Sequence, residues 1–128
     1  PIVYQDIIDD LIEKAKANGN ACSAVSCYET VVLTENRTSG KEQIDRNRIV
    51  RVQTPQCYNY GLIKSLYEKA DKDNREDFVY ANILAMNYGV EIYFSKGTNN
   101  NIKITTKDDI ALFRALLYYI NNAEGEEN

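Results

Sequence analysis

The stretch QDIIDDLIEKAKANGNACSAVSCY, residues 5–28, places a helical pattern directly before a strand pattern. Apolar side chains recur at helical spacing in its first part. Asn18 and Gly19 then offer residues that tolerate the left-handed backbone of a helix end, so we predict a helix over residues 5–17. The small apolar residues of 21–28 are typical of a strand that is buried on both faces. A helix followed by such a strand indicates an α/β layer.

Residues 29–53, called the arm below, have the pattern of a long β-hairpin. Two β-prone stretches flank the polar turn sequence ENRTSGKE, in which Gly40 is the expected residue of positive φ. The stretches carry many arginines and glutamates but little apolar alternation, so the hairpin has no full apolar face to bury against its own domain. Because an isolated two-stranded ribbon is only marginally stable, we expect the arm to contact a partner surface.

The remaining residues continue the alternation of helices and strands. Pro55 is expected to stop a central strand and bend the chain. Thr106 with Asp109 resembles a capping box, with aspartate in place of the usual glutamate. The acidic residues 123–128, AEGEEN, are predicted to be a disordered tail after a single domain over residues 1–122. Periodicity and turn residues predict helices over 62–70 and 76–87, strands over 90–95 and 101–105, and a last helix through Ile120.

Composition excludes several classes of function. The net charge of −4 argues against a nucleic-acid or anionic-membrane surface, and no apolar run approaches the roughly 20 residues of a membrane span. Histidine is absent, which removes the Ser-His and Cys-His nucleophilic sites. The three cysteines, Cys22, Cys27 and Cys57, have neither CxxC spacing nor histidine partners, so they predict buried thiols in a reducing cytoplasm and no metal site.

The sequence NNNIKITTKDD at residues 99–109 places a lysine between two isoleucines and ahead of a helix start. Strand alternation would put Ile102 and Ile104 on one face and Lys103 on the other. Open α/β sheets bind ligands at the carboxyl ends of their strands, and both a lysine ammonium and helix-start amides favour phosphate oxygens. Two interpretations stay open: Lys103 binds phosphate, or it is a solvated lysine on an exposed strand face.

Several short motifs follow one another along the chain: Pro1 ahead of a helix, ET at 29–30, IDR at 44–46, QTPQ at 53–56 and NIKITTKDDI at 101–110. Their order resembles the C-terminal half of the cytidylyltransferases that act on 2-C-methylerythritol 4-phosphate or ribitol 5-phosphate. The resemblance implies a partial Rossmann-like mixed sheet with flanking helices and a protruding β-hairpin dimerisation arm. It also implies coupling of CTP to a polyol phosphate with release of pyrophosphate, with Mg²⁺ accompanying CTP.

The resemblance implies roles for four residues. Lys103 matches the lysine that contacts the reacting phosphate of the nucleotide and stabilises the charge that builds on it. Thr30, Arg46 and Thr54 match residues that hold the phosphate of the polyol substrate, the first two on an arm that crosses into the neighbouring subunit of a homodimer. From the residues alone a second interpretation stays open, with Arg46 one of several hairpin arginines and both threonines ordinary extended residues.

The resemblance also implies that part of such an enzyme lies outside this chain. The glycine-rich loop that cradles the CTP phosphates, and an Asp and an Arg ahead of the proline matching Pro1, have no counterpart here. We therefore expect the acceptor-side half of an enzyme, inactive by itself. Glu29 replaces the family's aspartate, and Val79-Tyr80 replaces a Thr-Asp pair, which leaves the identity of the polyol open. The alternative is a non-catalytic dimerisation module derived from the same fold.

Overall fold

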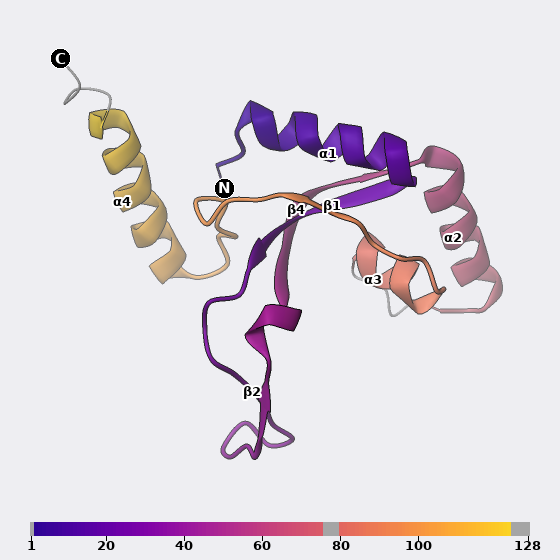
Figure 1. Cartoon of the computed structure of the whole chain (residues 1–128), viewed down its shortest axis with the longest axis horizontal. Coiled ribbons are helices and arrows are strands. Elements are labelled where there is room, and N and C mark those ends of the chain that lie inside the picture. Colours follow the sequence, from indigo (N-terminus) through magenta and orange to yellow (C-terminus); the bar gives the residue numbers. More distant parts are fainter. Residues whose placement is uncertain (1, 76–79, 124–128) are drawn as a thin grey trace. The chain divides into compact units, whose positions relative to one another are not determined.

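The computed structural model describes residues 2–75 and 80–123. The chain forms two compact units, Gln5–Gly97 and Pro1–Tyr4 with Thr98–Asn128, and each is described by itself. The described helices and strands (Figure 1) are α1 (Gln5–Asn18), β1 (Asn20–Ser26), β2 (Val31–Leu33), β3 (Glu42–Ile44), the 3₁₀ helix η1 (Arg46–Arg48), β4 (Val50–Tyr58), α2 (Tyr60–Lys72), α3 (Ala81–Asn87), β5 (Phe94–Lys96) and α4 (Lys107–Ala123).

A mixed three-stranded sheet with strand order β4-β1-β5 forms the centre of the first unit. Strand β1 pairs antiparallel with β4 and parallel with β5. Ala21 packs with Leu11 and Ala15 of α1, while Cys22 packs in a second cluster with Leu66 of α2 and residues of α3. Because neighbouring residues of β1 enter different apolar clusters, the strand is buried on both faces. The α/β prediction is confirmed, as are the helix before β1 and the helix that became α2.

Strand β4 shows that the expected effect of Pro55 was wrong, because the strand runs through this residue to Tyr58. Cys22 pairs with Gln56 and Ala24 with Val52, so residues 53–55 bulge opposite the single residue between Cys22 and Ala24. In this chain β4 is an edge strand of the sheet. Proline is tolerated at a bulge and on an edge strand, where its missing N–H breaks no ladder.

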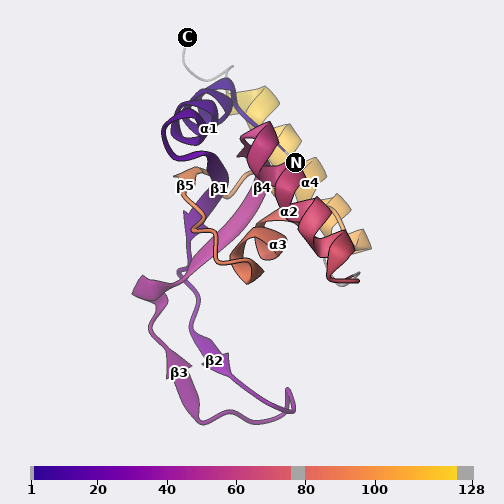
Figure 2. The ribbon, with the colours of Figure 1, turned by 90° about the vertical axis from the view of Figure 1, so that its right-hand side faces the viewer.

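The hairpin prediction for the arm is confirmed in its middle, where β2 and β3 form an antiparallel two-stranded ribbon. Figure 2 shows this ribbon extending away from the three-stranded sheet. The conformation expected of Gly40 was wrong, since the positive φ of the turn, 61°, belongs to Arg37. A Cβ on Gly40 would lie 2.5 Å from Cγ1 of Val32 and 2.9 Å from the backbone oxygen of Leu33, so glycine is required there for close approach.

Two further element boundaries differ from the prediction. The strand expected over 90–95 is limited to Phe94–Lys96. In the helix expected over 76–87, residues 76–79, including Val79, lie outside the described residues, and Tyr80 is extended with φ −131° and ψ 134°. The helix α3 therefore begins at Ala81, one residue after its extended cap.

The second unit contains the last helix, α4, which the sequence predicted through Ile120. The strand expected over 101–105 was wrong, because none of these residues belongs to a strand. Ala123 still belongs to α4, and the rest of the predicted tail lies outside the described residues. A single domain over residues 1–122 stays a prediction.

Candidate functional site

Lys103 lies in an irregular segment that has no strand neighbours among the described residues. Its side chain is exposed, as predicted, but the isoleucines beside it do not share a buried face. Ile102 is half-buried and Ile104 is 40% exposed. Without a paired strand there is no pleat to send alternate side chains to opposite sides of a sheet. Hydrogen bonds of their own hold the residues on either side of Lys103.

On the N-terminal side of Lys103, a hydrogen-bonded turn spans residues 98–101. The Asn101 N–H donates to the Thr98 carbonyl at 3.1 Å, and the Asn100 N–H donates to the Thr98 hydroxyl at 3.2 Å. The Asn100 amide also donates to the Tyr4 hydroxyl at 3.3 Å. Asn101 is only 9% exposed. The turn is thus anchored both by burial and by a contact to the start of the chain.

On the C-terminal side, the predicted capping box of Thr106 and Asp109 is confirmed. The Thr106 N–H and hydroxyl lie 2.7 and 2.8 Å from Oδ2 of Asp109, and the Asp109 N–H donates back to the Thr106 hydroxyl at 3.3 Å. Thr105 adds two more bonds to the same oxygen, from its N–H and its hydroxyl, each at 2.9 Å. These donors, with the Thr105 N–H the largest contributor, lower the pKa of Asp109 from 3.8 to about 2.

The start of α4 is a weaker anion site than the sequence suggested. The first turn contains two carboxylates, Asp108 and Asp109, and the Asp109 N–H is already bonded to Thr106. Negative side chains at a helix N-terminus interact with the same partial positive charge that an anion would use. An interaction of this segment with phosphate therefore depends on the Lys103 ammonium.

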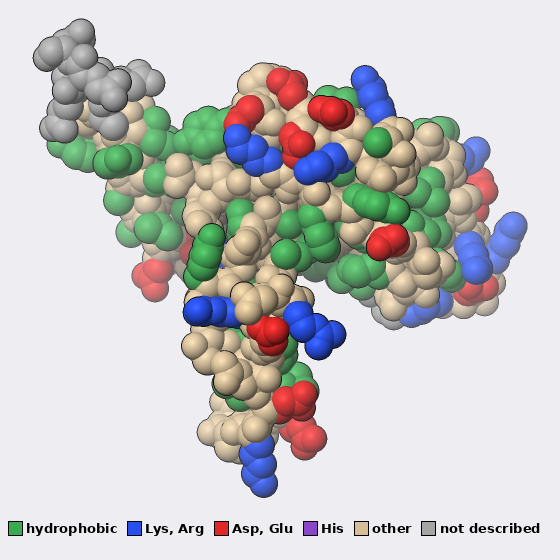
Figure 3. All heavy atoms as spheres, viewed as in Figure 1, with side chains coloured by type: hydrophobic (Ala, Val, Ile, Leu, Met, Phe, Trp, Pro, Cys, Tyr) green, Lys and Arg blue, Asp and Glu red, His purple; other side chains and the backbone are tan. Residues whose placement is uncertain are grey.

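Arg46 and Thr30 lie at the base of the arm. Arg46 opens η1, whose cap residue Asp45 accepts the Asn47 N–H at 3.0 Å. From there Nη1 of Arg46 reaches back to the Tyr28 carbonyl at 3.3 Å, two residues before the exposed Thr30. Figure 3 shows basic side chains on both sides of the arm where it leaves the rest of the unit. The structure thus brings Arg46 to the stretch that contains Thr30.

Glu29, which precedes Thr30, folds back onto its own backbone. Its carboxylate accepts the Tyr28 N–H at 3.1 Å and the Cys27 thiol at 3.5 Å. The pKa of Glu29 is lowered, first by its own backbone N–H, then by the Cys27 thiol and the charge of Arg51. Glu29 therefore stabilises the bend from which Thr30 continues into β2.

Thr54 is exposed in the bulge of β4, opposite Ser23 of β1. The last pair of β1 and β4 joins Ser26 to Val50, and Tyr28, which Arg46 contacts, lies two residues beyond it. Thr54 and the contact of Arg46 therefore lie on opposite sides of the Ser26–Val50 pair.

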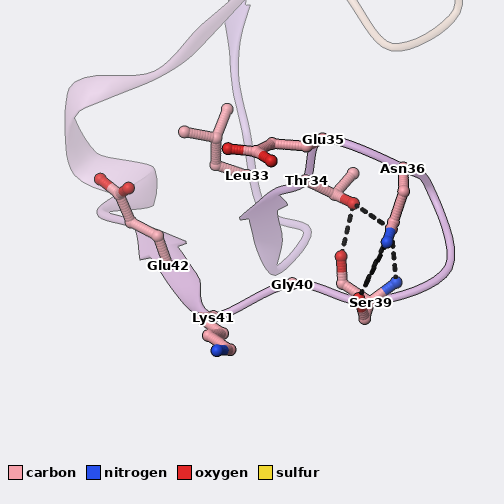
Figure 4. Close-up of a pocket in the computed structure, with 8 residues that line it drawn as sticks. All are labelled: Leu33, Thr34, Glu35, Asn36, Ser39, Gly40, Lys41 and Glu42. Carbon is pink, nitrogen blue, oxygen red and sulfur yellow. Dashed lines mark hydrogen bonds between the residues drawn. The ribbon is translucent and has the colours of Figure 1, made fainter.

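A separate hollow lies at the tip of the arm (Figure 4), far along the ribbon from these residues. Its loop is closed on itself: Oδ1 of Asn36 accepts the N–H groups of Thr38 and Ser39, at 2.9 and 3.0 Å. None of the four predicted site residues lines it. The lining residues are Leu33, Thr34, Glu35, Asn36, Ser39, Gly40, Lys41 and Glu42.

The described residues do not fit a metal site of their own. Within residues 2–75 and 80–123, no group of three or more His, Cys, Asp or Glu side chains could hold a metal ion. In the same part of the chain, no helix combines the length and apolar character that crossing a membrane requires.

Comparison with known proteins identifies the family. The family model described as IspD, 2-C-methyl-D-erythritol 4-phosphate cytidylyltransferase, matches residues 1–119. This match extends from the start of the chain through the arm and Lys103 into α4. The chain belongs to this family. The predicted family is therefore confirmed, while the assignment of the chain to the C-terminal half stays a prediction. The residues named from the family motifs lie within the matched region.

Curated relatives include enzymes named for ribitol 5-phosphate and enzymes named for 2-C-methyl-D-erythritol 4-phosphate. A ribitol-5-phosphate cytidylyltransferase of Lacticaseibacillus paracasei is 36% identical over 119 residues, covering 91% of this chain and 51% of the relative. A 2-C-methyl-D-erythritol 4-phosphate cytidylyltransferase of Clostridium novyi is 34% identical over 117 residues, with 91% and 50% covered. The chain thus spans about half the length of these relatives.

Solved structures agree with the fold. The 2-C-methyl-D-erythritol 4-phosphate cytidylyltransferase of Thermus thermophilus matches with a TM-score of 0.79 at 24% identity, covering 91% of this chain and 56% of that one. The corresponding enzyme of Francisella tularensis matches with a TM-score of 0.74 at 26% identity, with 89% and 54% covered. The mixed sheet with flanking helices is therefore the fold of this family.

Proposed function

We propose that this chain is the C-terminal, acceptor-side half of a cytidylyltransferase that couples CTP to a polyol phosphate. The observation that carries the proposal is the family match over residues 1–119, a range that contains Lys103, Thr30, Arg46 and Thr54. The 128 residues contain no glycine-rich phosphate loop, and they span about half of the relatives. The nucleotide-side half is then supplied by the rest of a longer protein, and the chain by itself is inactive.

In the proposed reaction an oxygen of the polyol phosphate attacks the α-phosphorus of CTP. The bond from this phosphorus to the β-phosphate oxygen breaks, and pyrophosphate leaves with that bond's electron pair. Negative charge grows on the α-phosphate oxygens during attack, and the Lys103 ammonium stabilises it by charge-assisted hydrogen bonds. Mg²⁺ bound with CTP would neutralise further triphosphate charge, but the described part of this chain offers no ligand cluster for it.

We further propose that the acceptor phosphate is held by two copies of the chain. Thr54 of one copy and the Thr30 and Arg46 pair of its neighbour would meet once the arm crosses over. The apolar residues of the arm support this arrangement, because Val32 and Leu33 are 47% and 54% exposed, and Tyr28, directly ahead of the arm, is 70% exposed. A partner surface would remove this apolar area from water.

The decisive experiment is Lys103→Ala in the longer enzyme that contains this chain. We expect kcat to fall by roughly 10²–10³, the scale of losing one preorganised donor to a developing oxyanion, with a small change in KM for the polyol phosphate. Lys107→Ala is the matched control, because it removes an exposed lysine four positions away and should keep kcat within about twofold. Pyrophosphate release should be measured with both ribitol 5-phosphate and 2-C-methylerythritol 4-phosphate.

A kcat of Lys103→Ala within about twofold of the unchanged enzyme would contradict the proposed role of Lys103. No pyrophosphate release by the longer protein with either polyol phosphate would favour the non-catalytic dimerisation module. Turnover by the 128-residue chain alone, above a control without protein, would contradict the half-enzyme proposal. The polyol phosphate with the higher kcat/KM would identify the acceptor.

A further inference from the structure

We propose that Asp109 is a positioning residue that fixes the backbone of Lys103, in addition to capping α4. The inference rests on the proposed function only in assigning a catalytic role to Lys103. The contacts of Asp109 are properties of the described chain itself.

Lys103 needs such a device because its segment belongs to no strand among the described residues. A lysine side chain is long and flexible, so a stable position for its ammonium begins with a fixed backbone. Displacing a catalytic group by about 1 Å can cost a hundredfold in rate. In a strand the ladder of hydrogen bonds would supply this rigidity, whereas here side chains must supply it.

The bonds from Thr105 distinguish Asp109 from an ordinary capping residue. A capping box requires only the reciprocal hydrogen bonds between Thr106 and Asp109. Here Oδ2 of Asp109 also receives the N–H and the hydroxyl of Thr105, both at 2.9 Å. Thr105 lies ahead of the helix and only two residues after Lys103. The carboxylate therefore ties down the irregular segment as well as the first turn of α4.

The other end of the segment is fixed independently. Asn101 is nearly buried, and its N–H closes the turn onto Thr98 at 3.1 Å. The Asn100 amide extends this anchor to the Tyr4 hydroxyl. Lys103 thus lies midway between two fixed residues, Asn101 and Thr105, with a single residue between it and each of them.

The kinetic test compares Asp109→Ala with Asp108→Ala in the longer enzyme. Both changes remove one carboxylate from the first turn of α4, but only Asp109 is bonded to Thr105. We expect Asp109→Ala to lower kcat about 10- to 100-fold, with little change in KM for the polyol phosphate, and Asp108→Ala to stay within about twofold. In a Lys103→Ala background, Asp109→Ala should cause no further loss, because it acts through the lysine. If kcat of the double variant instead falls by the product of the two single-variant factors, the proposal is overturned.

A second readout is independent of activity. Backbone ¹⁵N order parameters of residues 102–105 in the 128-residue chain should fall in Asp109→Ala and stay unchanged in Asp108→Ala. Thr105→Val removes one bond next to Lys103 while leaving the Thr106 box intact, so it should loosen the segment without unwinding α4. Unchanged order parameters of residues 102–105 in both Asp109→Ala and Thr105→Val would overturn the positioning role of Asp109. A Lys103→Ala variant with unchanged kcat would instead overturn the proposed function. The order parameters would still test the positioning role of Asp109.

Discussion

Arg46 shows how one side chain of the arm differs from its neighbours of equal charge. Arg46 and Arg48 both belong to η1 and both are exposed. Arg46 is held by a hydrogen bond to the Tyr28 carbonyl, which directs its guanidinium toward the stretch containing Thr30. A guanidinium has five donors, so this contact still leaves most of them for a phosphate. This contact is the structural basis for proposing Arg46 as the phosphate-binding arginine of the arm.

At this scale we predict that Arg46→Ala in the longer enzyme raises KM for the polyol phosphate about 10- to 100-fold, the equivalent of one charge-assisted hydrogen bond. The effect on kcat should be small, since a clamp on the acceptor phosphate serves the ground state and the transition state alike. Arg48→Ala is the control and should change neither constant more than about twofold. Equal changes in KM for both variants would show that Arg46 is merely one of several hairpin arginines.

Individual residues could be predicted from the sequence where their partners are close along the chain. Thr106 and Asp109 are three positions apart, and the spacing alone identified their capping box. The contact of Tyr4 with Asn100 joins residues 96 positions apart, and no local pattern signals it. Gly40 was misjudged for a different reason, because close backbone approach and positive φ both select glycine and the sequence does not distinguish them.

At the scale of elements, the ends of strands depended on tertiary partners. Asn20, only 2% exposed, places its side chain against the residues ahead of β5. Its amide donates to the Glu91 carbonyl at 2.9 Å, and its Oδ1 accepts the Tyr93 N–H at 3.2 Å. The Asn20 side chain thus supplies hydrogen bonds that strand pairing would otherwise supply, which explains why β5 begins at Phe94 although the preceding residues look β-prone. The apolar pattern of the sequence does not reveal that a side chain replaces backbone pairing.

We therefore predict that Asn20→Ala lowers the free energy of unfolding by about 1–3 kcal/mol, because it leaves the Glu91 carbonyl and the Tyr93 N–H without their partner in a partly buried place. Asn18→Ala is the matched control. Its amide also donates to a backbone carbonyl, that of Lys14, but at the exposed end of α1. The control should therefore change stability by less than about 0.5 kcal/mol. Urea unfolding of the unchanged chain, Asn20→Ala and Asn18→Ala measures the two stability changes. Equal losses of unfolding free energy in the two variants would contradict the bridging role of Asn20.

At the scale of the whole molecule, the sequence predicted the fold class better than it predicted the completeness of the site. Helical and strand periodicity identified the α/β layers because each element buries its own apolar face. The four site residues were named from family motifs, and three of them, Thr30, Arg46 and Thr54, belong to the first unit. Arg46 contacts the stretch that contains Thr30, whereas Thr54 lies in the bulge of β4, on the other side of the Ser26–Val50 pair. The proposed assembly of two copies rests on the exposed apolar residues of the arm, which periodicity does not reveal.

The final prediction concerns that assembly. We expect the 128-residue chain to sediment as a dimer, because two-stranded ribbons are marginal by themselves and Val32 and Leu33 are about half exposed on this one. A variant lacking residues 33–43 should sediment as a monomer, since it loses most of the β2–β3 ribbon. The control is Leu112→Ser on α4, which removes an apolar side chain that is 56% exposed outside the arm and should leave the dimer intact. A dimer that survives the deletion would show that the contact lies elsewhere, and a monomeric unchanged chain would contradict pairing through the arm altogether.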